Sequence, residues 1–291
     1  MPDKTISHQK VIAIIEGNHE GLVPLKGGRH YGAAEGFAAC LQALDASVLC
    51  RIIRPHFSDH IYHDGLFDGC DGAVFTGSGN AWSADDDDAA PARKVMGCAL
   101  DSQLPVFGSC YGLQLAVAVL GGANQSNPIA TEFAIARDII INDAGQRHAL
   151  YQGKSHKFDA RCMHRDEIAR LPDGAISLSK NGHSAHQAMV YEQGGICFWG
   201  VQYHPELRFD DIAHYIETSD VDSFADAKAF SEKLGITADI TEIADDFRRY
   251  EISKDERLVK KYHLSASLTD DNHHRCEIAN FLKMVSCPSS G

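Results

Sequence analysis

The cysteines of this sequence do not form the pairs that a disulfide framework or a zinc cluster requires. Their number, nine, is odd, and no two are spaced as Cys-x-x-Cys. Disulfide-rich domains and structural zinc sites show paired or closely spaced cysteines. The pattern therefore predicts free thiols and a reducing compartment, which we expect to be the cytoplasm. The cysteines are Cys40, Cys50, Cys70, Cys98, Cys110, Cys162, Cys197, Cys276 and Cys287.

Long hydrophobic runs are also absent. Nowhere do about 18 apolar residues follow one another, which is the length that a membrane-spanning helix needs. The start of the sequence, residues 1–10, is polar and leads directly into a short apolar run, unlike a secretory signal. We therefore expect a cytoplasmic protein that has no membrane as its partner.

Positive charge is scarce. The sequence has 27 Lys and Arg against 40 Asp and Glu, which gives a formal net charge of −13. Nucleic acids and anionic membranes bind basic surfaces, so this balance disfavours both as the main partner. The hydrophobic share of 44% in 291 residues is enough for a sizeable core, in one large domain with an appendage or in two domains.

Apolar runs and helical patterns alternate along the first half of the chain. Continuous apolar runs are typical of strands that are buried on both faces of a parallel sheet. The alternation predicts a doubly wound α/β sheet, which places ligands at the carboxyl ends of its strands. The runs lie at residues 10–15, 47–53, 72–75 and 104–107, and the helical patterns at 31–44 and 89–102.

The pattern changes after residue 129. Short runs rich in Ile, Phe and Val are separated by Gly, Asn and Asp, which predicts antiparallel strands added to the parallel core. The expected fold class is therefore α/β, with a doubly wound, mixed, mostly parallel sheet flanked by helices. The later runs lie at residues 129–141, 156–163, 175–179, 187–191 and 196–202.

The last part of the chain is mostly helical by pattern. We predict a main domain at residues 1–218 and a small helical extension at residues 219–291. The extension is rich in charge, so it is either a solvated appendage that stabilises the main domain or a surface that binds a partner. Its expected helices lie at residues 223–234, 239–250 and 271–285.

A sharp turn carries Cys110 between a strand and a helix. The two glycines Gly108 and Gly112 let the backbone fold tightly enough to expose Cys110 above the sheet, as Ser is exposed in a nucleophile elbow. The partial positive charge of a helix N-terminus favours the thiolate form. Cys110 is therefore either a nucleophile or one of the buried cysteines that are common in cores.

A second candidate segment ends the apolar run at residues 196–202. His204 follows this run, and Glu206 lies two residues further, where an extended chain returns side chains to the same face. The carboxylate can therefore orient the imidazole. Cys110, His204 and Glu206 fit the roles of nucleophile, base and orienting acid in covalent catalysis.

Four segments carry a resemblance to a known family. The sequence contains Gly108-Ser109-Cys110-Tyr111-Gly112-Leu113-Gln114 and, later, Gly200-Val201-Gln202-Tyr203-His204-Pro205-Glu206. Together they resemble the class I (triad) glutamine amidotransferases, and among these the glutaminase domain of GMP synthase. Thr76-Gly77-Ser78-Gly79 resembles the family's oxyanion loop, and His164-Arg165-Asp166 resembles a segment before its last strands. The resemblance extends over residues 10–217.

The resemblance implies an enzyme that hydrolyses a γ-glutamyl amide, glutamine by default, through a thioester on Cys110. It implies a triad of Cys110, His204 and Glu206 and no cofactor. One backbone N–H in residues 77–79 and that of Tyr111 would stabilise the oxyanion, and the remaining residues would contact the substrate. The oxyanion and substrate residues implied in this way are Gly77, Ser78, Gly79, Tyr111, Gln114, His164 and Asp166.

The resemblance leaves the nitrogen acceptor open. GMP synthases carry an ATP-using synthetase part, whereas no Gly-rich phosphate loop follows the triad here. We therefore expect either a subunit that passes ammonia to a separate synthetase or a stand-alone hydrolase of γ-glutamyl peptides and related compounds.

Three other interpretations remain open from the residues alone. The first is an α/β-hydrolase with a Cys elbow, although those enzymes place the acid between the nucleophile and the His. The second is a binding protein that keeps the fold without catalysis. The third is a metal site, because an H-x₃-H-x₂-H spacing with neighbouring acids suits a borderline cation. Its residues would be His56, Asp59, His60, His63 and Asp64.

Overall fold

The computed structural model describes residues 9–26, 29–30, 32–218 and 222–285. The predicted boundary at residues 218–219 adjoins the gap in this range. Most of the polar start, on which the expectation of no secretory signal rests, also lies outside the described residues. Among the described residues, none of the helices has the length and apolar character needed to cross a membrane.

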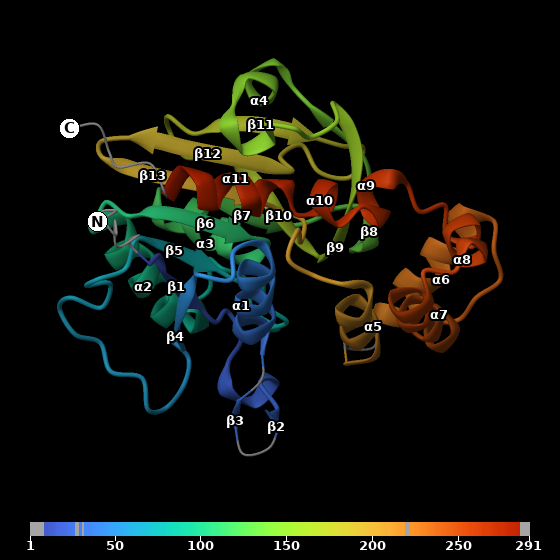
Figure 1. The fold of residues 1–291 in the computed structure, drawn as a ribbon, viewed down its shortest axis with the longest axis horizontal. Helices are drawn as coiled ribbons and strands as arrows, with labels where there is room; N and C mark the ends of the chain where they lie inside the picture. The colour runs from blue at the N-terminus through green and yellow to red at the C-terminus, as the bar shows by residue number, and fades with distance from the viewer. Residues whose placement is uncertain (1–8, 27–28, 31, 219–221, 286–291) are drawn as a thin grey trace, which may run out of the picture.

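A nine-stranded mixed sheet forms the centre of the molecule, in the order β4-β1-β5-β6-β13-β12-β11-β8-β9 (Figure 1). The first five strands pair parallel and the remainder pair antiparallel, which confirms the predicted mixed α/β fold. The parallel strands are β1 (Val11–Ile15), β4 (Leu49–Ile53), β5 (Gly72–Phe75), β6 (Pro105–Ser109) and β13 (Ile196–Val201). The antiparallel strands are β8 (Glu132–Ile141), β9 (Lys157–His164), β11 (Ile176–Lys180) and β12 (Ala188–Gln193).

Strand β13 joins the two halves of the sheet. We expected it among the antiparallel strands, but it pairs parallel with β6 on one side and antiparallel with β12 on the other. Two small sheets that the sequence did not predict lie outside the main one. They pair β2 (Leu25–Lys26) with β3 (Arg29–His30) and β7 (Ala123–Ser126) with β10 (Asp166–Arg170).

Helices cover both faces of the parallel half. In β1, Ile12 and Ile14 face one core cluster while Ala13 and Ile15 face the other, as the two-residue period of a strand requires. The first cluster contains side chains from α1 (Ala33–Leu44) and α11 (Cys276–Val285), and the second those from α2 (Ala90–Asp101) and α3 (Tyr111–Val119).

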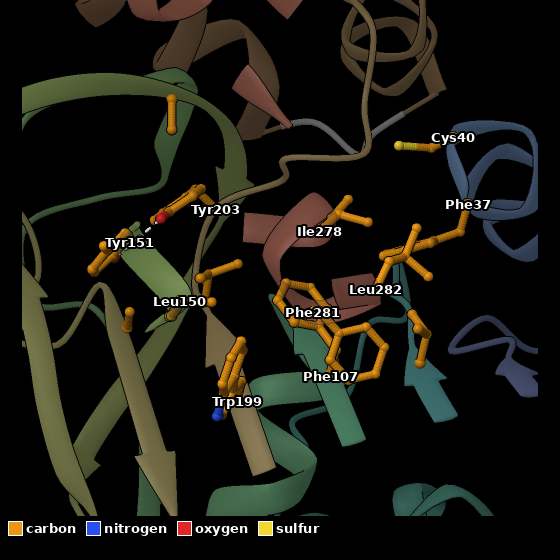
Figure 2. Close-up of a cluster of buried hydrophobic side chains, with 14 of the residues drawn as sticks. Phe37, Cys40, Phe107, Leu150, Tyr151, Trp199, Tyr203, Ile278, Phe281 and Leu282 are labelled. Atoms are coloured by element: carbon orange, nitrogen blue, oxygen red, sulfur yellow. Dashed lines mark hydrogen bonds between the residues drawn. The ribbon is translucent and has the colours of Figure 1, made fainter. Parts of the chain in front are cut away.

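The last described helix, α11, is part of the main core. Phe281 is fully buried, and its ring centroid lies 5.6 Å from that of Phe107 on β6. Ile278 and Leu282 of the same helix are buried beside it, as Figure 2 shows. The division at residue 218 stays a prediction, but α11 packs against the sheet that lies on the other side of that division.

A third apolar cluster packs most of the other C-terminal helices against β8. Phe209, Phe247 and Tyr262 are buried in it, and the centroids of the Phe209 and Phe247 rings lie 5.0 Å apart.

The predicted helix at 271–285 is interrupted at Arg275, whose ψ of 13° departs from helical values. The helices of this region are α5 (Phe209–Thr218), α6 (Asp222–Leu234), α7 (Ile240–Ser253), α8 (Glu256–Lys261), α9 (Ala266–Thr269) and α10 (Asp271–His274). The short helix α4 (Asp143–Arg147) and the 3₁₀ turns Glu20–Leu22, Asp87–Ala89 and Ala149–Tyr151 complete the described elements.

Candidate active site

Cys110 lies in the predicted turn between β6 and α3. Its φ of 49° is unusual for a residue with a side chain and marks the strained backbone of an elbow. The turn depends on glycine at both ends. A Cβ at Gly108 would lie 2.6 Å from the carbonyl carbon of Gly112, and one at Gly112 would lie 2.4 Å from the carbonyl oxygen of Phe75. The Cys110 N–H donates to the Val201 carbonyl at 2.8 Å, which fixes the turn to β13.

The end of β13 brings His204 and Glu206 to the same place. The Nδ1 of His204 donates to the Oε1 of Glu206 at 2.7 Å, and Ser109 Oγ donates to the same oxygen at 2.9 Å. The three side chains are buried, since Cys110 is 5% exposed and His204 and Glu206 are each 6% exposed. The carboxylate therefore holds the imidazole in one orientation, in which the ring also forms a hydrogen bond with Cys110.

The charges around His204 favour its protonated form. Burial lowers the pKa of His204, but the negative charges of Glu206 and Cys110 and hydrogen bonds to both outweigh burial and raise the pKa to about 10. A protonated imidazole beside a sulfur is the arrangement that stabilises a thiolate. The geometry thus brings a sulfur, an imidazole with a raised pKa and a carboxylate into one buried site.

The loop after β5 faces the triad. The His204 ring packs directly on Gly77, because a Cβ at Gly77 would lie 2.4 Å from His204 Cε1. The Gly79 N–H is already bound, donating to Asn18 Oδ1 at 2.8 Å. Within the described part of the chain, no group accepts the N–H of Gly77, Ser78 or Tyr111. Among the described groups, these three amides therefore keep no acceptor, whereas the amide of Gly79 has one.

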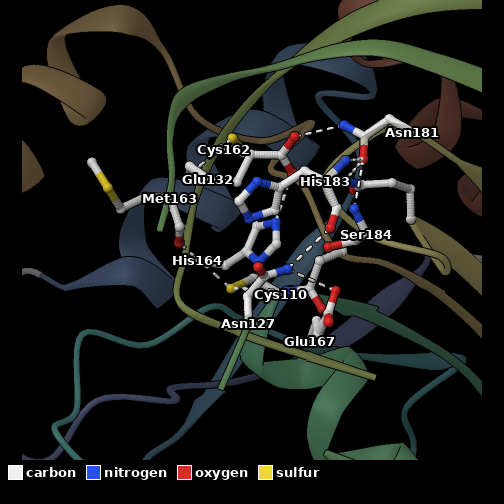
Figure 3. Close-up of polar contacts among 12 residues, drawn as sticks. Cys110, Asn127, Glu132, Cys162, Met163, His164, Glu167, Asn181, His183 and Ser184 are labelled. Carbon is white, nitrogen blue, oxygen red and sulfur yellow. Dashed lines mark hydrogen bonds and ion pairs between the residues drawn. The ribbon is translucent and has the colours of Figure 1, made fainter. Parts of the chain in front are cut away.

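Polar groups lie on the side of Cys110 that faces β9 and β10 (Figure 3). The sulfur is 3.8 Å from the Met163 carbonyl, and Gln202 Nε2 donates to the sulfur at 3.6 Å. Gln114 Nε2 donates to the Asp166 carbonyl at 2.8 Å. Gln114 also lies 3.4 Å from Gln202 Oε1, so it reaches the sulfur only through Gln202, and Asp166 contacts Gln114 through its backbone carbonyl.

His164 is placed differently from the other implied substrate residues. Its Nε2 lies 2.8 Å from Glu132 Oε2, and its Nδ1 lies 3.1 Å from the Asp166 carbonyl. Burial raises the pKa of Glu132, but its hydrogen bond to His164 and nearby charges outweigh burial and lower it. Both ring nitrogens of His164 thus contact groups of the protein. The ring helps to hold these polar groups in place and offers no free nitrogen to a ligand.

Several residues of the site were not predicted as site residues, among them Gln202, Glu132, Asn18, Ser109 and Met163. Gln202 stands two residues before His204, so the same alternation that pointed to Glu206 could have pointed to it. Glu132 and Asn18 reach the site only through strand pairing and loop contacts, which no local pattern shows.

The candidate metal ligands do not converge. His56 lies beside Trp82 at 5.7 Å between ring centroids, and His60 contacts Tyr62 at 4.4 Å. Among the residues described by the structure, no three His, Cys, Asp or Glu side chains are grouped so as to hold a metal ion. A cavity of about 660 Å³ borders this loop and β4, and none of the triad residues lines it.

Comparison with known families identifies the chain's class. Residues 39–219 match the sequence model of the family described as glutamine amidotransferase class-I. The match covers more than half of the chain, so the chain belongs to the class I glutamine amidotransferases. This agrees with the fold and with the resemblance carried by the four sequence segments.

Two relatives illustrate the range of the family. The chain is 36% identical over 124 residues to a gamma-glutamyl-L-1-hydroxyisopropylamide hydrolase of Pseudomonas, a match that covers 42% of each protein. It is 30% identical over 112 residues to a subunit of the glutamine-hydrolysing GMP synthase of Methanopyrus kandleri, which covers 38% of this chain and 57% of that relative. The matches thus span about half the length of these relatives.

Solved structures show the same fold over nearly the whole chain. A glutamine amidotransferase from Thermotoga maritima matches with a TM-score of 0.60 at 15% identity, covering 97% of this chain and 100% of that one. One from Methylobacillus flagellatus matches with a TM-score of 0.60 at 18% identity, covering 97% of both chains. At such identities the likeness concerns the fold alone.

Proposed function

We propose that this protein hydrolyses a γ-glutamyl amide through a thioester on Cys110. The observation that carries the proposal is the meeting of Cys110, His204 and Glu206 in one buried site at the ends of β6 and β13. The Cys110 sulfur attacks the amide carbon, His204 gives its proton to the leaving nitrogen, and the carbon–nitrogen bond breaks. Water then attacks the thioester and gives a proton to His204, after which the carbon–sulfur bond breaks to release glutamate.

The oxyanion of each tetrahedral intermediate needs preorganised donors. We assign these to the N–H of Tyr111 and to an N–H of Gly77 or Ser78, because these amides have no acceptor among the described groups. Tyr111 is the first residue of α3, where an N–H has no partner within the helix. Loss of one oxyanion donor typically costs on the order of 10² to 10³ in rate.

The substrate is glutamine or another small γ-glutamyl amide. Gln114, which contacts Gln202 next to the sulfur, and Asp166, which contacts Gln114, are the proposed contacts for the γ-glutamyl end. A relative named as a γ-glutamyl amide hydrolase favours a stand-alone hydrolase, whereas relatives named as GMP synthase subunits favour a protein that supplies ammonia to a separate synthetase. Both roles use the same thioester chemistry and need no cofactor.

Two further features complete the proposal. All proposed site residues lie within residues 1–218, so we propose this part as the catalytic domain and residues 219–291 as a helical extension whose helix α11 completes its core. The described cysteines are free thiols, which fits the cytoplasm that the sequence led us to expect.

Glutamate release tests the function and separates the two roles. Purified protein is assayed with glutamine and with a panel of N-substituted γ-glutamyl amides, with Cys110→Ala as the test variant and Cys98→Ala, at an exposed thiol, as the control. We expect release that Cys110→Ala abolishes and Cys98→Ala leaves unchanged. Rapid turnover of substituted amides supports the stand-alone hydrolase, and slow turnover of glutamine alone supports the ammonia-supplying role. Release that persists in Cys110→Ala contradicts the proposal.

A further inference from the structure

A buried carboxylate that the reaction itself does not use lies at the carboxyl end of β1. Glu16 is completely buried. Its Oε1 accepts the Asn18 N–H at 3.1 Å and Asn18 Nδ2 at 2.8 Å, and its Oε2 accepts the Ala34 N–H at the start of α1 at 2.9 Å. Burial raises the pKa of Glu16, and these three bonds oppose that effect. Both carboxylate oxygens are therefore committed to fixed donors.

Glu16 decides which way the Asn18 amide points. Because Nδ2 of Asn18 donates to Glu16, its Oδ1 must face the opposite side, where the oxyanion loop lies. There Oδ1 accepts the Gly79 N–H at 2.8 Å and the Ser78 hydroxyl at 3.3 Å. Asn18 is only 6% exposed, so no water layer competes for these bonds.

The preceding peptide of the loop, between Gly77 and Ser78, is also fixed by contacts with the chain around Gly17. Thr76 Oγ1 accepts the Gly17 N–H at 2.9 Å and donates to the Gly77 carbonyl at 2.8 Å. In a trans peptide the C=O and N–H point in opposite directions, so holding the Gly77 carbonyl toward Gly17 turns the Ser78 N–H away from Gly17. Asn80 adds a second tie by donating to the Gly17 carbonyl at 2.9 Å and accepting the His19 N–H at 3.1 Å.

We propose that Glu16 and Asn18 are positioning residues that hold the oxyanion loop, residues 77–79, in the orientation that its donors need. The inference rests on the proposed function for the identity of the loop. It assigns to the end of β1 a task in the reaction without any contact with the substrate. Neither residue is part of the triad, and neither lies in the four segments that resemble the family.

The test compares two reactions of the same sulfur. Acylation by para-nitrophenyl acetate passes through a tetrahedral oxyanion, whereas alkylation by iodoacetamide displaces iodide at a saturated carbon and forms no oxyanion. Acylation is followed by the burst of para-nitrophenolate, and alkylation by mass spectrometry of the Cys110 peptide. The background from other thiols is taken from Cys110→Ala. Neither reagent needs a γ-glutamyl group, so the result does not depend on the physiological substrate.

For Asn18→Ala we expect acylation of Cys110 to fall by at least about tenfold while alkylation stays within about twofold, since the loop donors are turned and the sulfur is unchanged. The matched control is Asn142→Ala at the start of α4. It also removes an Asn side chain that accepts a glycine N–H, since Asn142 Oδ1 accepts the Gly145 N–H at 2.9 Å. The control should change neither rate. Acylation within about twofold of wild type overturns the inference, and so does an equal fall of both reactions.

A pair of variants that exchanges the carboxylate and the amide distinguishes the loss of this contact from misfolding of the protein. Asn18→Asp places a carboxylate against Glu16 and should lose acylation as Asn18→Ala does. In the double variant Glu16→Gln with Asn18→Asp, the new amide can donate to the new carboxylate and Gly79 regains its acceptor, while the N–H of residue 18 loses the Oε1 acceptor of the wild type, so recovery should be partial. We expect the double variant to recover acylation several-fold over Asn18→Asp, and no recovery contradicts the pairing. A wild type that is acylated in this assay but releases no glutamate from any γ-glutamyl amide rejects the proposed function and leaves this inference standing.

Discussion

Gly77 is the residue on which the geometry of the triad most directly depends. The imidazole of His204 lies so close to its Cα that a methyl group would be 2.4 Å from Cε1. The Glu206 carboxylate binds the neighbouring ring atom, with 2.7 Å between Nδ1 and Oε1. His204 is therefore in contact with both a glycine and a carboxylate, and each contact yields a separate prediction.

Gly77→Ala should displace His204 without unfolding the protein. We expect kcat/KM for glutamate release to fall by on the order of 10²-fold, because small displacements of a catalytic group can cost that much. Gly97→Ala is the matched control, since no atom lies within 4 Å of a Cβ at this helical position. It should leave activity unchanged and stabilise the protein slightly, by about 0.4 to 1 kcal/mol. Wild-type activity in Gly77→Ala contradicts the assigned geometry.

Glu206→Gln should lower the pKa of His204. Because the pKa of His204 is raised by folding, the charge interaction of its protonated ring with Glu206 stabilises the folded protein fully below the ordinary pKa of about 6.5. This stabilisation is lost as the pH rises through about 10. The amide removes the negative charge and keeps the shape, so the pKa should fall by about 1 to 3.

An NMR titration of the His204 ring measures this shift. The control is Glu192→Gln, which removes the carboxylate beside His148 and should leave the titration of His204 unchanged. An unchanged pKa in Glu206→Gln would show that Glu206 does not govern the charge of the imidazole.

At the scale of elements, the site is assembled from the carboxyl ends of neighbouring strands. β1 supplies Glu16 and Asn18, β5 the oxyanion loop, β6 the elbow and β13 the His204 segment. These four strands are adjacent and parallel, so their ends meet at one edge of the sheet. Helix α11 covers β6 from one face, and its packing determines how firmly that strand is held.

Phe281→Ala should strongly destabilise the fold. The ring is fully buried in α11 against Phe107, and removing a buried aromatic side chain costs about 3 to 5 kcal/mol. Lys283→Ala, at an exposed position on the same helix, should change the free energy of unfolding by less than about 0.5 kcal/mol. Urea denaturation measures both. A cost below about 1 kcal/mol for Phe281→Ala would mean that α11 is not part of the main core.

At the scale of the whole molecule, the sequence predicted those features of the fold that leave a local pattern in the chain. The apolar runs marked β1, β4, β5 and β6, although β4 is an edge strand that is largely exposed, contrary to the expectation of burial on both faces. The glycines around Cys110 marked the elbow, because tight turns leave local signals. The resemblance added the family, which the match over residues 39–219 confirms.

Other features depend on which elements meet in space, and these the sequence could not show. An amphipathic helix such as α11 can cover a distant sheet or lie at the surface, and its pattern is the same in both cases. The antiparallel pairing of β7 with β10 and the contacts of Asn18 with the oxyanion loop likewise depend on long-range order. The Nε2 of His164 is occupied for the same reason, since Glu132 comes from the neighbouring strand β8, whereas Nδ1 contacts the carbonyl of Asp166 only two residues away.

Trapping of the acyl-enzyme tests the central claim most directly. The protein is mixed with glutamine or a γ-glutamyl amide, quenched in acid during turnover and analysed by mass spectrometry of the intact chain and of its Cys110 peptide. The account predicts a γ-glutamyl adduct on Cys110 that hydroxylamine removes, that Cys110→Ala lacks and that Cys98→Ala retains. Turnover without any adduct on Cys110, or an adduct on another residue, would contradict the assignment of Cys110 as the nucleophile.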